Sequence, residues 1–458
     1  MYSVNSERHG GVFMDKNREF SRSKWFVLIL FGLIGQIAWA VENMYFNLFV
    51  FNTVAPSLKT ITLMVQLSGV AATVVTLIAG TVSDKTGNRR SFISWGYIIW
   101  GITVAVFGFL SPELMQSIFN MELGKAVSLT LALVVVADCV MTVFGSAAND
   151  AAFNAWVTDN TDTSYRGKVE GILSILPLIA LLIVSGGFGI IVEAIGYDMM
   201  FLSLGIVISL SGVFGLVYVK DKSGLRKSGS MKDIFYGFKP SVIKANKAFY
   251  VSLLIILVYG IACQIFMPYL VIYMSTHLGF SPLEYSAVFA IAILLGAAIN
   301  VFLTRLSDRL DKVKLLYVSS AVMACGLFFM YLSDGESKIA NLIFFGISGF
   351  VMITGYIFTS ALCGSTIRDY TPEGGVGKLQ GVRMVFSVLI PMLVGPMIGN
   401  TINKARGELL PNPDSADTIT TNYTPAPEIF LAAAVTMLLI FAVIPVLSKF
   451  AKSKKSED

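Results

Sequence analysis

The sequence contains repeated apolar runs, each long enough to form a helix that crosses a bilayer. A membrane-spanning helix needs roughly 20 mostly apolar residues, because the hydrocarbon core is about 30 Å thick. Such runs recur from residue 25 to residue 448. They predict twelve spans, at residues 25–51, 60–82, 91–110, 127–150, 168–192, 199–219, 248–274, 283–304, 313–332, 338–362, 377–403 and 428–448.

The composition agrees with an exterior that faces lipid. Of the 458 residues, 55% are hydrophobic and only 14% are charged, whereas a soluble chain of this length needs a charged surface. We therefore predict an all-α polytopic membrane protein. Residues 1–24 form a polar N-terminal tail without the apolar core and cleavage site of a signal peptide, so we expect the first span to be retained.

The distribution of Lys and Arg predicts the orientation of the chain. Most of these residues lie in the N-terminal tail, in the connections at the same end of the spans, and in the tail 449–458. Short loops rich in Lys and Arg stay on the cytoplasmic side. Both termini should therefore be cytoplasmic, in a plasma (inner) membrane. The opposite loops hold Lys59, Lys125, Lys338, Lys404 and Arg406.

Charge and cysteine use exclude several other classes of protein. The net charge of +5 does not indicate a nucleic-acid partner, because the basic residues do not form one patch. The four cysteines fall in or at the ends of spans, which argues against a disulfide framework. The two histidines, His9 and His277, lie far apart, so no metal site is expected. No cofactor is expected beyond a coupling proton or sodium ion.

The chain divides into two related halves. Residues 220–247 form a charged cytoplasmic linker, with a short surface helix expected near 231–238, between a bundle at 25–219 and a bundle at 248–448. Parallel repeats of this kind mark one large class of transporters. Three patterns recur in the same order: GxxxQI at 32–37 and 260–265, SDK at 83–85 with SDR at 307–309, and DxTxxxxxGKxxG at 159–171 and 369–381.

A basic turn separates the second and third spans. Gly80 would permit close helix approach, Asp84 could accept hydrogen bonds from a helix N-terminus, and Gly87 suits a tight turn. The simpler interpretation is a basic loop that remains in the cytoplasm. The full pattern is Gly80-x3-Asp84-Lys85-x-Gly87-x-Arg89-Arg90, with a weaker copy at Asp308 and Arg309.

This pattern resembles the signature loop of the major facilitator superfamily, at the same place in the topology. The resemblance implies two pseudo-symmetric six-helix bundles around a central cavity, with access that alternates between the two faces. It also implies that the loop after the second span helps to latch one conformation. Glu42, the acids of the fourth span and the Gly-Lys-x2-Gly loops are similar to those of glycoside–pentoside–hexuronide cation symporters and sucrose-type carriers.

One face of the first span is polar and aromatic. At 100° per residue, its side chains fall on an arc of about 140°. Aromatic rings stack on the apolar faces of sugars, and amides and carboxyls bind hydroxyl groups. We predict that this stripe lines a solute path, although amides that join neighbouring helices are the alternative. The stripe consists of Gln36, Trp39, Glu42, Asn43, Phe46 and Asn47.

Charged side chains inside spans are the candidates for cation coupling. A charge at the bilayer centre costs about 2.5–3.5 kcal/mol, so it usually faces a cavity or a partner. Glu42 lies past the middle of the first span, toward the outside, Asp138 is the deeper acid of the fourth span, and Asp150 lies nearer the cytoplasmic end. Arg383 begins the eleventh span and could pair with an acid or extend to the inner surface. Structural roles remain open for Glu42 and for Asp150 with its neighbour Asn149.

The second half offers matching candidates. Gln264 corresponds to Gln36 in the repeat, and Tyr269 follows it in the seventh span, where Pro268 should produce a kink. Asn149, Asn300 and Tyr356 complete the predicted cavity, although packing is the commoner role of a membrane tyrosine.

These features predict a secondary transporter, favouring proton- or sodium-coupled symport of a sugar or glycoside. The expected partners are the lipid bilayer and this solute, and the expected state is a monomer. A drug or metabolite exporter of the same fold is the first alternative. A transporter-like nutrient sensor or membrane enzyme is the second. The sequence lacks a Walker-type phosphate loop, and it shows no clustered nucleophile and base, so we do not expect an enzyme.

Overall fold

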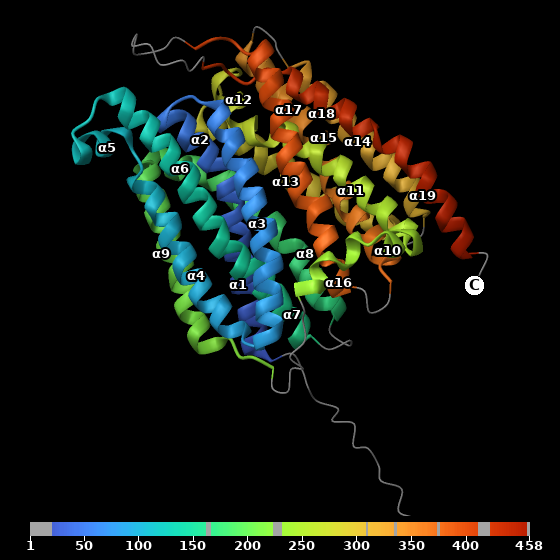
Figure 1. The fold of residues 1–458 in the computed structure, drawn as a ribbon. Helices are drawn as coiled ribbons and strands as arrows, with labels where there is room; N and C mark the ends of the chain where they lie inside the picture. The colour runs from blue at the N-terminus through green and yellow to red at the C-terminus, as the bar shows by residue number, and fades with distance from the viewer. Residues whose placement is uncertain are drawn as a thin grey trace, which may run out of the picture.

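The computed structural model describes residues 21–161, 166–222, 231–307, 310–333, 337–372, 376–410 and 422–455. Its ribbon is a set of long helices in two groups, blue to green and yellow-green to red (Figure 1). Within the described residues, the pairing of Leu409 with Tyr423 is an isolated β-bridge. The all-helical prediction is therefore confirmed.

The first bundle contains the helices of the first half. Several spans are built from an α-helix that continues without a break into a π-turn or a 3₁₀-turn. The elements are α1 (Arg22–Val41), η1 (Glu42–Phe46), α2 (Asn47–Phe49), η2 (Val50–Val54), α3 (Leu58–Thr86), α4 (Arg89–Val106), η3 (Phe107–Phe109), α5 (Pro112–Phe119), α6 (Leu123–Gly145), η4 (Ser146–Phe153), α7 (Asn154–Asn160), α8 (Arg166–Ile183), η5 (Val184–Phe188) and α9 (Gly189–Tyr218).

The second bundle follows a short helical linker. The elements are η6 (Met231–Phe238) and α10 (Pro240–Ala245) of the linker, then α11 (Lys247–Phe266), η7 (Met267–Tyr269), α12 (Leu270–Thr276), α13 (Pro282–Ser307), α14 (Lys312–Tyr331), α15 (Lys338–Tyr370), α16 (Val376–Met384), η8 (Val385–Leu389), α17 (Ile390–Arg406), α18 (Glu428–Leu438) and α19 (Ile440–Lys455).

The described helices account for twelve crossings. Eleven segments are long and apolar enough to cross a membrane, and one of them, Gly171–Tyr218, has 48 residues. At about 1.5 Å per residue, such a segment is roughly twice the length that a bilayer requires. It turns back at Gly196, whose φ of 80° and ψ of 167° are not helical and suit a residue without a Cβ. The segment therefore supplies the fifth and sixth crossings.

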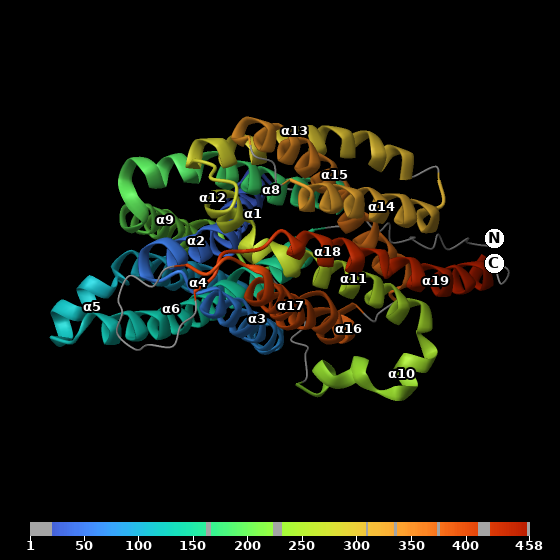
Figure 2. The same ribbon diagram turned by 90° about the horizontal axis from the view of Figure 1, so that it is seen from above.

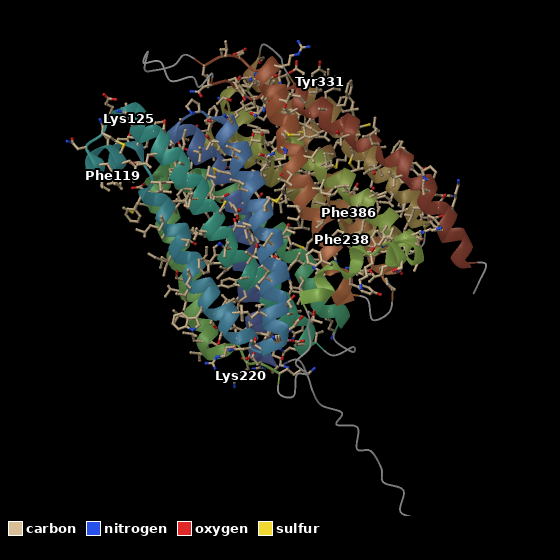
Figure 3. All side chains as sticks on the ribbon, viewed as in Figure 1. Phe119, Lys125, Lys220, Phe238, Tyr331 and Phe386 are labelled. Atoms are coloured by element: carbon tan, nitrogen blue, oxygen red, sulfur yellow. The ribbon has the colours of Figure 1, made fainter. Side chains whose placement is uncertain are left out.

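Large apolar side chains cover the outside of both bundles. Ile102, Ile206, Phe302 and Ile343 are each at least half exposed, which in water would be a strong aggregation hazard. In lipid, the same surface is the expected one. Figure 3 shows side chains projecting from the helices along their whole length, with Phe119 and Lys125 at one end of the first bundle and Lys220 at the other.

We name the two ends of the molecule by their connections. The linker end carries residues 219–222 and 231–246, and the far end carries residues 55–57, 277–281 and 407–410. The view from above shows the two groups of helices in contact along part of their length (Figure 2). The first bundle meets the second along two seams, α3 against α17 and η8, and α13 against η5 and α9.

Two local predictions are confirmed. Met231–Phe238 forms a 3₁₀-helix, where a short linker helix was expected. Pro268 lies in the 3₁₀-turn Met267–Tyr269, which interrupts the seventh span between α11 and α12. Proline cannot donate a backbone hydrogen bond, so the helix changes its geometry at this position.

Candidate functional site

Two π-helical segments bring together the polar residues of the first bundle. The first, Glu42–Phe46, interrupts the first span, and the second, Ser146–Phe153, interrupts the fourth. A π-turn widens the helix and leaves part of the backbone ladder unmatched, and such turns are frequent at functional sites. Both of these begin at or next to a buried acid or hydroxyl side chain, Glu42 and Ser146.

Glu42 and Asp138 form what we call the acid pair. Glu42 is 8% exposed and Asp138 is 2% exposed. The Thr142 hydroxyl lies 3.2 Å from Oε1 of Glu42 and 2.8 Å from the backbone carbonyl oxygen of Asp138, so α6 contributes both an acid and a hydroxyl next to Glu42. The Ser68 side chain of α3 lies beside the Asp138 carboxyl. Three helices therefore contribute to one buried polar cluster.

The acid pair has unused hydrogen-bonding capacity. Oε2 of Glu42 and Oδ1 of Asp138 lack a partner among the described residues. The ion pairs of the described chain do not include either acid. The two carboxyls interact electrostatically with each other. Buried carboxylates without a positive charge are unfavourable, so the cluster is suited to bind a proton or a small cation.

Asp150 lies farther toward the linker end of the same bundle. Its carboxyl lies beside Ser146 and Trp39, and it contributes more weakly than Asp138 to the electrostatics of Glu42. The Trp39 ring packs on Trp100, with ring centroids 5.0 Å apart. Trp39 thus packs between Asp150 and Trp100.

The predicted stripe of the first span is only partly maintained. Gln36 and Trp39 are half-buried and Asn43 is exposed. Phe46 instead packs inside the first bundle, with its ring centroid 4.0 Å from that of Phe107. Asn47 is 3% exposed and donates to the carbonyl oxygen of Asn43. The π-turn at Glu42–Phe46 has more residues per turn than an α-helix, so a constant 100° step misplaces the residues that follow it.

Asn149 joins helices within the first bundle. Its amide donates to the Tyr97 hydroxyl at 2.5 Å, and that hydroxyl donates to the Phe31 carbonyl oxygen at 2.7 Å. The residue is 3% exposed. In this conformation Asn149 therefore connects the first, third and fourth spans.

Tyr269 lies on the seam between the bundles. Its hydroxyl is 2.8 Å from that of Thr62 in α3, and it also donates to the Pro396 carbonyl oxygen at 2.9 Å. A second bond crosses the same seam, from Gln66 to the Leu393 carbonyl oxygen at 2.8 Å. Because α3 begins at the far end, these bonds join the bundles in that half of the molecule.

Sequence reasoning missed Thr62 and Gln66. A signal was present, because Thr62, Gln66, Gly69 and Thr73 recur at the spacing of one helix face. Gly69 lies at a close approach of this seam: a Cβ there would lie 2.7 Å from Cβ of Met392. On the other seam, a Cβ at Gly189 would lie 2.6 Å from the Ser286 hydroxyl oxygen.

The remaining candidates of the second bundle lie within it. Gln264 is half-buried and packs against Gly395 of α17. Asn300 donates to the carbonyl oxygens of Gly296 and Thr354, at 2.8 and 3.2 Å, and so joins α13 to α15. Tyr356 is half-buried, and its ring centroid lies 5.7 Å from that of Tyr259. Arg383 lies in the last turn of α16 and is half-buried.

Arg89 is the centre of the predicted latch. It is nearly buried, and it donates to Asp84, to Ser83, and through Nε to Asp159 at 3.0 Å. Gly87 has a φ of 68° and ends α3, in agreement with the expected tight turn. Gly80 differs from expectation, since a Cβ there would make only an ordinary contact, 4.0 Å from Ala151.

The other latch residues lie at the surface or outside the described part of the chain. Lys85 and Arg90 are exposed, and the Arg90 backbone N–H donates to Asp221 at 2.9 Å. Asp308 and Arg309 lie outside the described residues. A related ion pair occurs in the second bundle, where Lys312 binds Asp369 at 2.5 Å. Asp159 and Asp369 occupy matched positions of the repeat.

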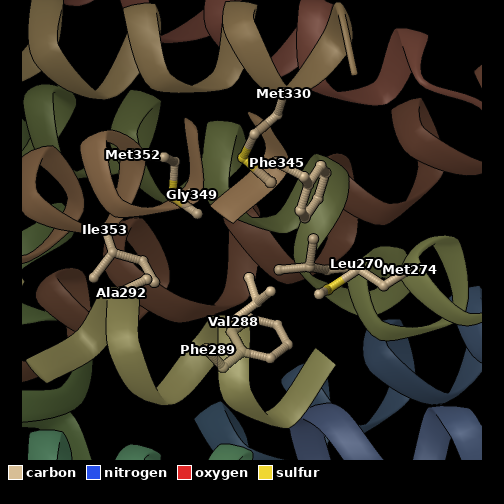
Figure 4. A pocket seen from close by; sticks show the side chains of 10 residues that line it. All are labelled: Leu270, Met274, Val288, Phe289, Ala292, Met330, Phe345, Gly349, Met352 and Ile353. Atoms are coloured by element: carbon tan, nitrogen blue, oxygen red, sulfur yellow. The ribbon is translucent and has the colours of Figure 1, made fainter. Parts of the chain in front are cut away.

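The second bundle also encloses a small apolar cavity (Figure 4). Its volume is about 10 Å³, at the lower limit of the space that one water molecule requires. Its lining is entirely apolar or glycine, and includes Met274, Phe289 and Met352. This cavity is a packing defect between α12, α13, α14 and α15, too small for a solute.

Solved structures of transporters share this fold. A bacterial homologue of the human lysosomal transporter Spinster, in an inward-facing and unoccupied conformation, matches with a TM-score of 0.63 and 13% identity over 94% of this chain and 98% of that one. The nucleoside transporter NupG matches with a TM-score of 0.62 and 13% identity over 93% and 98%. At these identities, the likeness concerns the fold alone.

The sequence itself identifies the family. No curated protein matches the chain. The model of the Major Facilitator Superfamily matches residues 25–396, which span both bundles. With twelve crossings in two related bundles among the described residues, this chain belongs to the Major Facilitator Superfamily.

Proposed function

We propose that this transporter is a symporter that couples the movement of a sugar or glycoside to a proton or sodium ion. The observation that carries the proposal is the acid pair, two buried carboxyls with an unpartnered oxygen each. Membership of the superfamily supports a membrane transporter. The choice of solute and ion is our inference from the residues.

The acid pair supplies the coupling step. With both carboxyls ionised, the cluster would contain two negative charges in a low-dielectric bundle, which is costly without compensation. A proton or a sodium ion reduces that cost. Because Glu42 starts a π-turn in the same helix as the half-buried Gln36 and Trp39, cation binding can change the part of α1 that we propose meets the solute.

The solute would bind between the bundles. Gln36, Trp39 and Asn43 of the first span offer amides and an indole, and none of them is fully buried. Gln264 and Tyr356 would face them from the second bundle. Amides bind hydroxyl groups and aromatic rings stack on the apolar faces of sugars, which favours a sugar over a wholly apolar drug. The resemblance to glycoside–pentoside–hexuronide symporters and sucrose-type carriers points the same way.

The distribution of Lys and Arg supports a proposal for the orientation of the transporter in the membrane. We propose that the linker end is cytoplasmic, since the connections at that end contain most of the Lys and Arg residues. Both termini are then cytoplasmic and the far end faces outward, in the plasma (inner) membrane. We further propose that the protein acts as a monomer, with one cavity between its two bundles.

The test is uptake by proteoliposomes that contain the purified full-length chain. A panel of sugars, glycosides and nucleosides is supplied under an imposed proton or sodium gradient. We expect one sugar or glycoside to accumulate, and accumulation to stop when an ionophore removes the relevant gradient. Accumulation of a nucleoside alone, or extrusion of apolar drugs alone, would contradict the proposed solute class.

Replacing Glu42 tests the coupling role separately. The Glu42→Gln variant keeps the size of the side chain but cannot release a proton or bind a cation as a carboxylate. It should lose accumulation against a gradient and keep exchange of labelled for unlabelled solute. Glu122→Gln is the matched control, because Glu122 is largely exposed at the start of α6. Full accumulation by Glu42→Gln would remove Glu42 from the coupling site.

A further inference from the structure

The linker between the bundles presents an amphipathic surface. We use the name linker surface for its exposed side chains, Phe235, Phe238, Lys239, Ile243, Lys244 and Lys247. Phe235 and Phe238 belong to η6, Ile243 and Lys244 belong to α10, Lys247 begins α11, and Lys239 lies between η6 and α10. Figures 1 and 2 show this segment at the edge of the second bundle, running across the direction of the spans and outside the main group of helices.

The opposite side of the segment is attached to the second bundle. Val242 is 8% exposed and packs in a cluster with Leu379 and Val382 of α16. The Tyr250 hydroxyl of α11 donates to the Gly237 carbonyl oxygen. The Val382 side chain also packs closely on Gly237, since a Cβ on Gly237 would lie 2.9 Å from Cγ1 of Val382. The linker surface is therefore held in one orientation, away from the protein.

The exposed side combines apolar and basic residues. Phe235 is 69% exposed, Phe238 is 41% exposed and Ile243 is 39% exposed. Lys239, Lys244 and Lys247 lie among them, and residues 235–247 contain no Asp or Glu. Water is a poor environment for such exposed aromatic rings, and a neutral protein surface would not compensate three like charges. Both features are satisfied by one environment, the boundary between anionic headgroups and acyl chains.

The position of the segment also places it near the boundary between headgroups and acyl chains. Lys247 is the first residue of the seventh span, so the preceding residues lie within a short distance of the membrane boundary. Apolar side chains of an interfacial segment enter the acyl boundary while lysines stay at the level of the phosphates. We propose that the linker surface binds anionic phospholipid headgroups of the adjacent leaflet. This proposal does not depend on the solute or on the coupling ion.

Lipid binding here would influence transport through α16. The linker packs on Leu379 and Val382, in the first part of the eleventh span, and the eleventh span forms a seam with α3 of the first bundle. A segment that is fixed to the leaflet and to α16 links the lipid composition to the position of this seam. Transport should therefore be faster in membranes that contain anionic lipid.

The test measures lipid binding directly. The detergent-solubilised full chain is titrated with phosphatidylglycerol or phosphatidylcholine, and bound lipids are counted by native mass spectrometry. The variant Lys239→Gln/Lys244→Gln/Lys247→Gln should bind phosphatidylglycerol more weakly, by roughly fivefold for each lysine removed. Its affinity for phosphatidylcholine should not change. The control Lys59→Gln/Lys125→Gln/Lys404→Gln removes three exposed lysines at the far end and should retain wild-type binding.

A second variant separates lipid from other anions. Phe235→Ser/Phe238→Ser keeps the lysines and removes the apolar contacts, and it should also weaken phosphatidylglycerol binding. If only the lysine variant loses binding, the surface is a general anion site and the proposal fails. Equal losses in the linker and far-end lysine variants would indicate nonspecific adsorption and contradict it. No loss in either linker variant would leave the surface to another occupant, such as a soluble protein, and would also overturn it.

Discussion

The Thr142 hydroxyl lies beside the Glu42 carboxyl of the proposed coupling site, one helical turn after Asp138. It donates to Glu42 at 3.2 Å across two helices. A hydrogen bond of this kind contributes about 1 kcal/mol, so Thr142→Val should reduce cation-driven uptake by roughly fivefold. Initial rates in proteoliposomes, with and without the imposed gradient, give the comparison.

The conservative variant provides the control for Thr142. Thr142→Ser keeps the hydroxyl and removes only a methyl group, so it should restore most of the rate. Exchange of labelled for unlabelled solute without a gradient should be similar in all three proteins. Equal rates for the valine variant and the wild type would show that the hydroxyl does not act on the site.

Single residues also show what the sequence can predict of the candidate site. Glu42 and Asp138 were identifiable because an acid in an apolar run is costly and therefore conspicuous. The hydrogen bond from Thr142 to Glu42 was not, because it joins two helices that must be placed in space first. Phe46 shows a second limit, because the π-turn that begins at Glu42 changes the helical phase. The residue types of this run do not predict a π-turn.

At the scale of the helices, the contact between α11 and α17 depends on glycine. A Cβ on Gly399 would overlap the carbonyl oxygen of Ile265, which is backbone and cannot rotate away. Gly399→Ala should therefore destabilise the protein by about 2 kcal/mol, as overpacking of a tight contact does. Thermal unfolding in detergent, followed by tryptophan fluorescence, measures the loss.

Gly364 is the matched control for this contact. It lies inside α15, and a Cβ there would meet nothing within 4 Å. Gly364→Ala should be neutral or raise the stability by about 0.5 kcal/mol, because alanine restricts the unfolded chain. Similar melting temperatures for Gly364→Ala and Gly399→Ala would contradict the role of the close approach.

The seam between α3 and the seventh span gives a prediction about conformation. Removing the hydroxyl bond with Thr62→Val or Tyr269→Phe should shift the protein toward a far-end-open state by roughly fivefold, the effect of about 1 kcal/mol. Spin labels at the exposed positions Lys125 and Lys404, one in each bundle, report the shift as a longer distance. Tyr269 also binds Pro396, so the double variant is needed to isolate the shared bond. If the shift in the double variant equals the sum of the shifts in the two single variants, the bond between Thr62 and Tyr269 does not stabilise the closed far end.

Helix patterns predict elements more completely than contacts between them. The spans, the turn at Gly87, the interruption at Pro268 and the linker helix at Met231–Phe238 all follow from local chemistry. The bond between Thr62 and Tyr269 joins residues 207 positions apart. A polar stripe indicates which face of a helix has a partner, but it contains no information about which helix supplies it.

At the scale of the whole molecule, the two bundles repeat one ionic arrangement. Each has a basic residue at the start of its third helix that binds an aspartate at the end of its fourth, Arg89 with Asp159 and Lys312 with Asp369. The sequence repeat predicts the two aspartates, whereas the two basic residues differ by one position when the loops are aligned. The two bundles therefore share the ion pair, although the position of its basic residue differs by one. A matching ion pair within each bundle suits bundles that move as rigid units.

Asp84 is the residue that connects this arrangement to the movement of the bundles. In this conformation its carboxylate, 45% exposed, binds Arg89 of the same bundle. In the Asp84→Ala variant, Arg89 would still form its ion pair with Asp159, so the first bundle should stay folded.

We propose that Asp84 latches the linker end when it closes. The variant should then show normal expression and reconstitution but an initial uptake rate lowered by about fivefold or more, the effect of one charge-assisted bond. Glu113→Gln, an exposed change in α5, controls for a general effect of charge. Unchanged initial uptake by Asp84→Ala in vesicles would rule out the latch, and it would leave the Arg89 network as a purely structural connection of α3, α4 and α7.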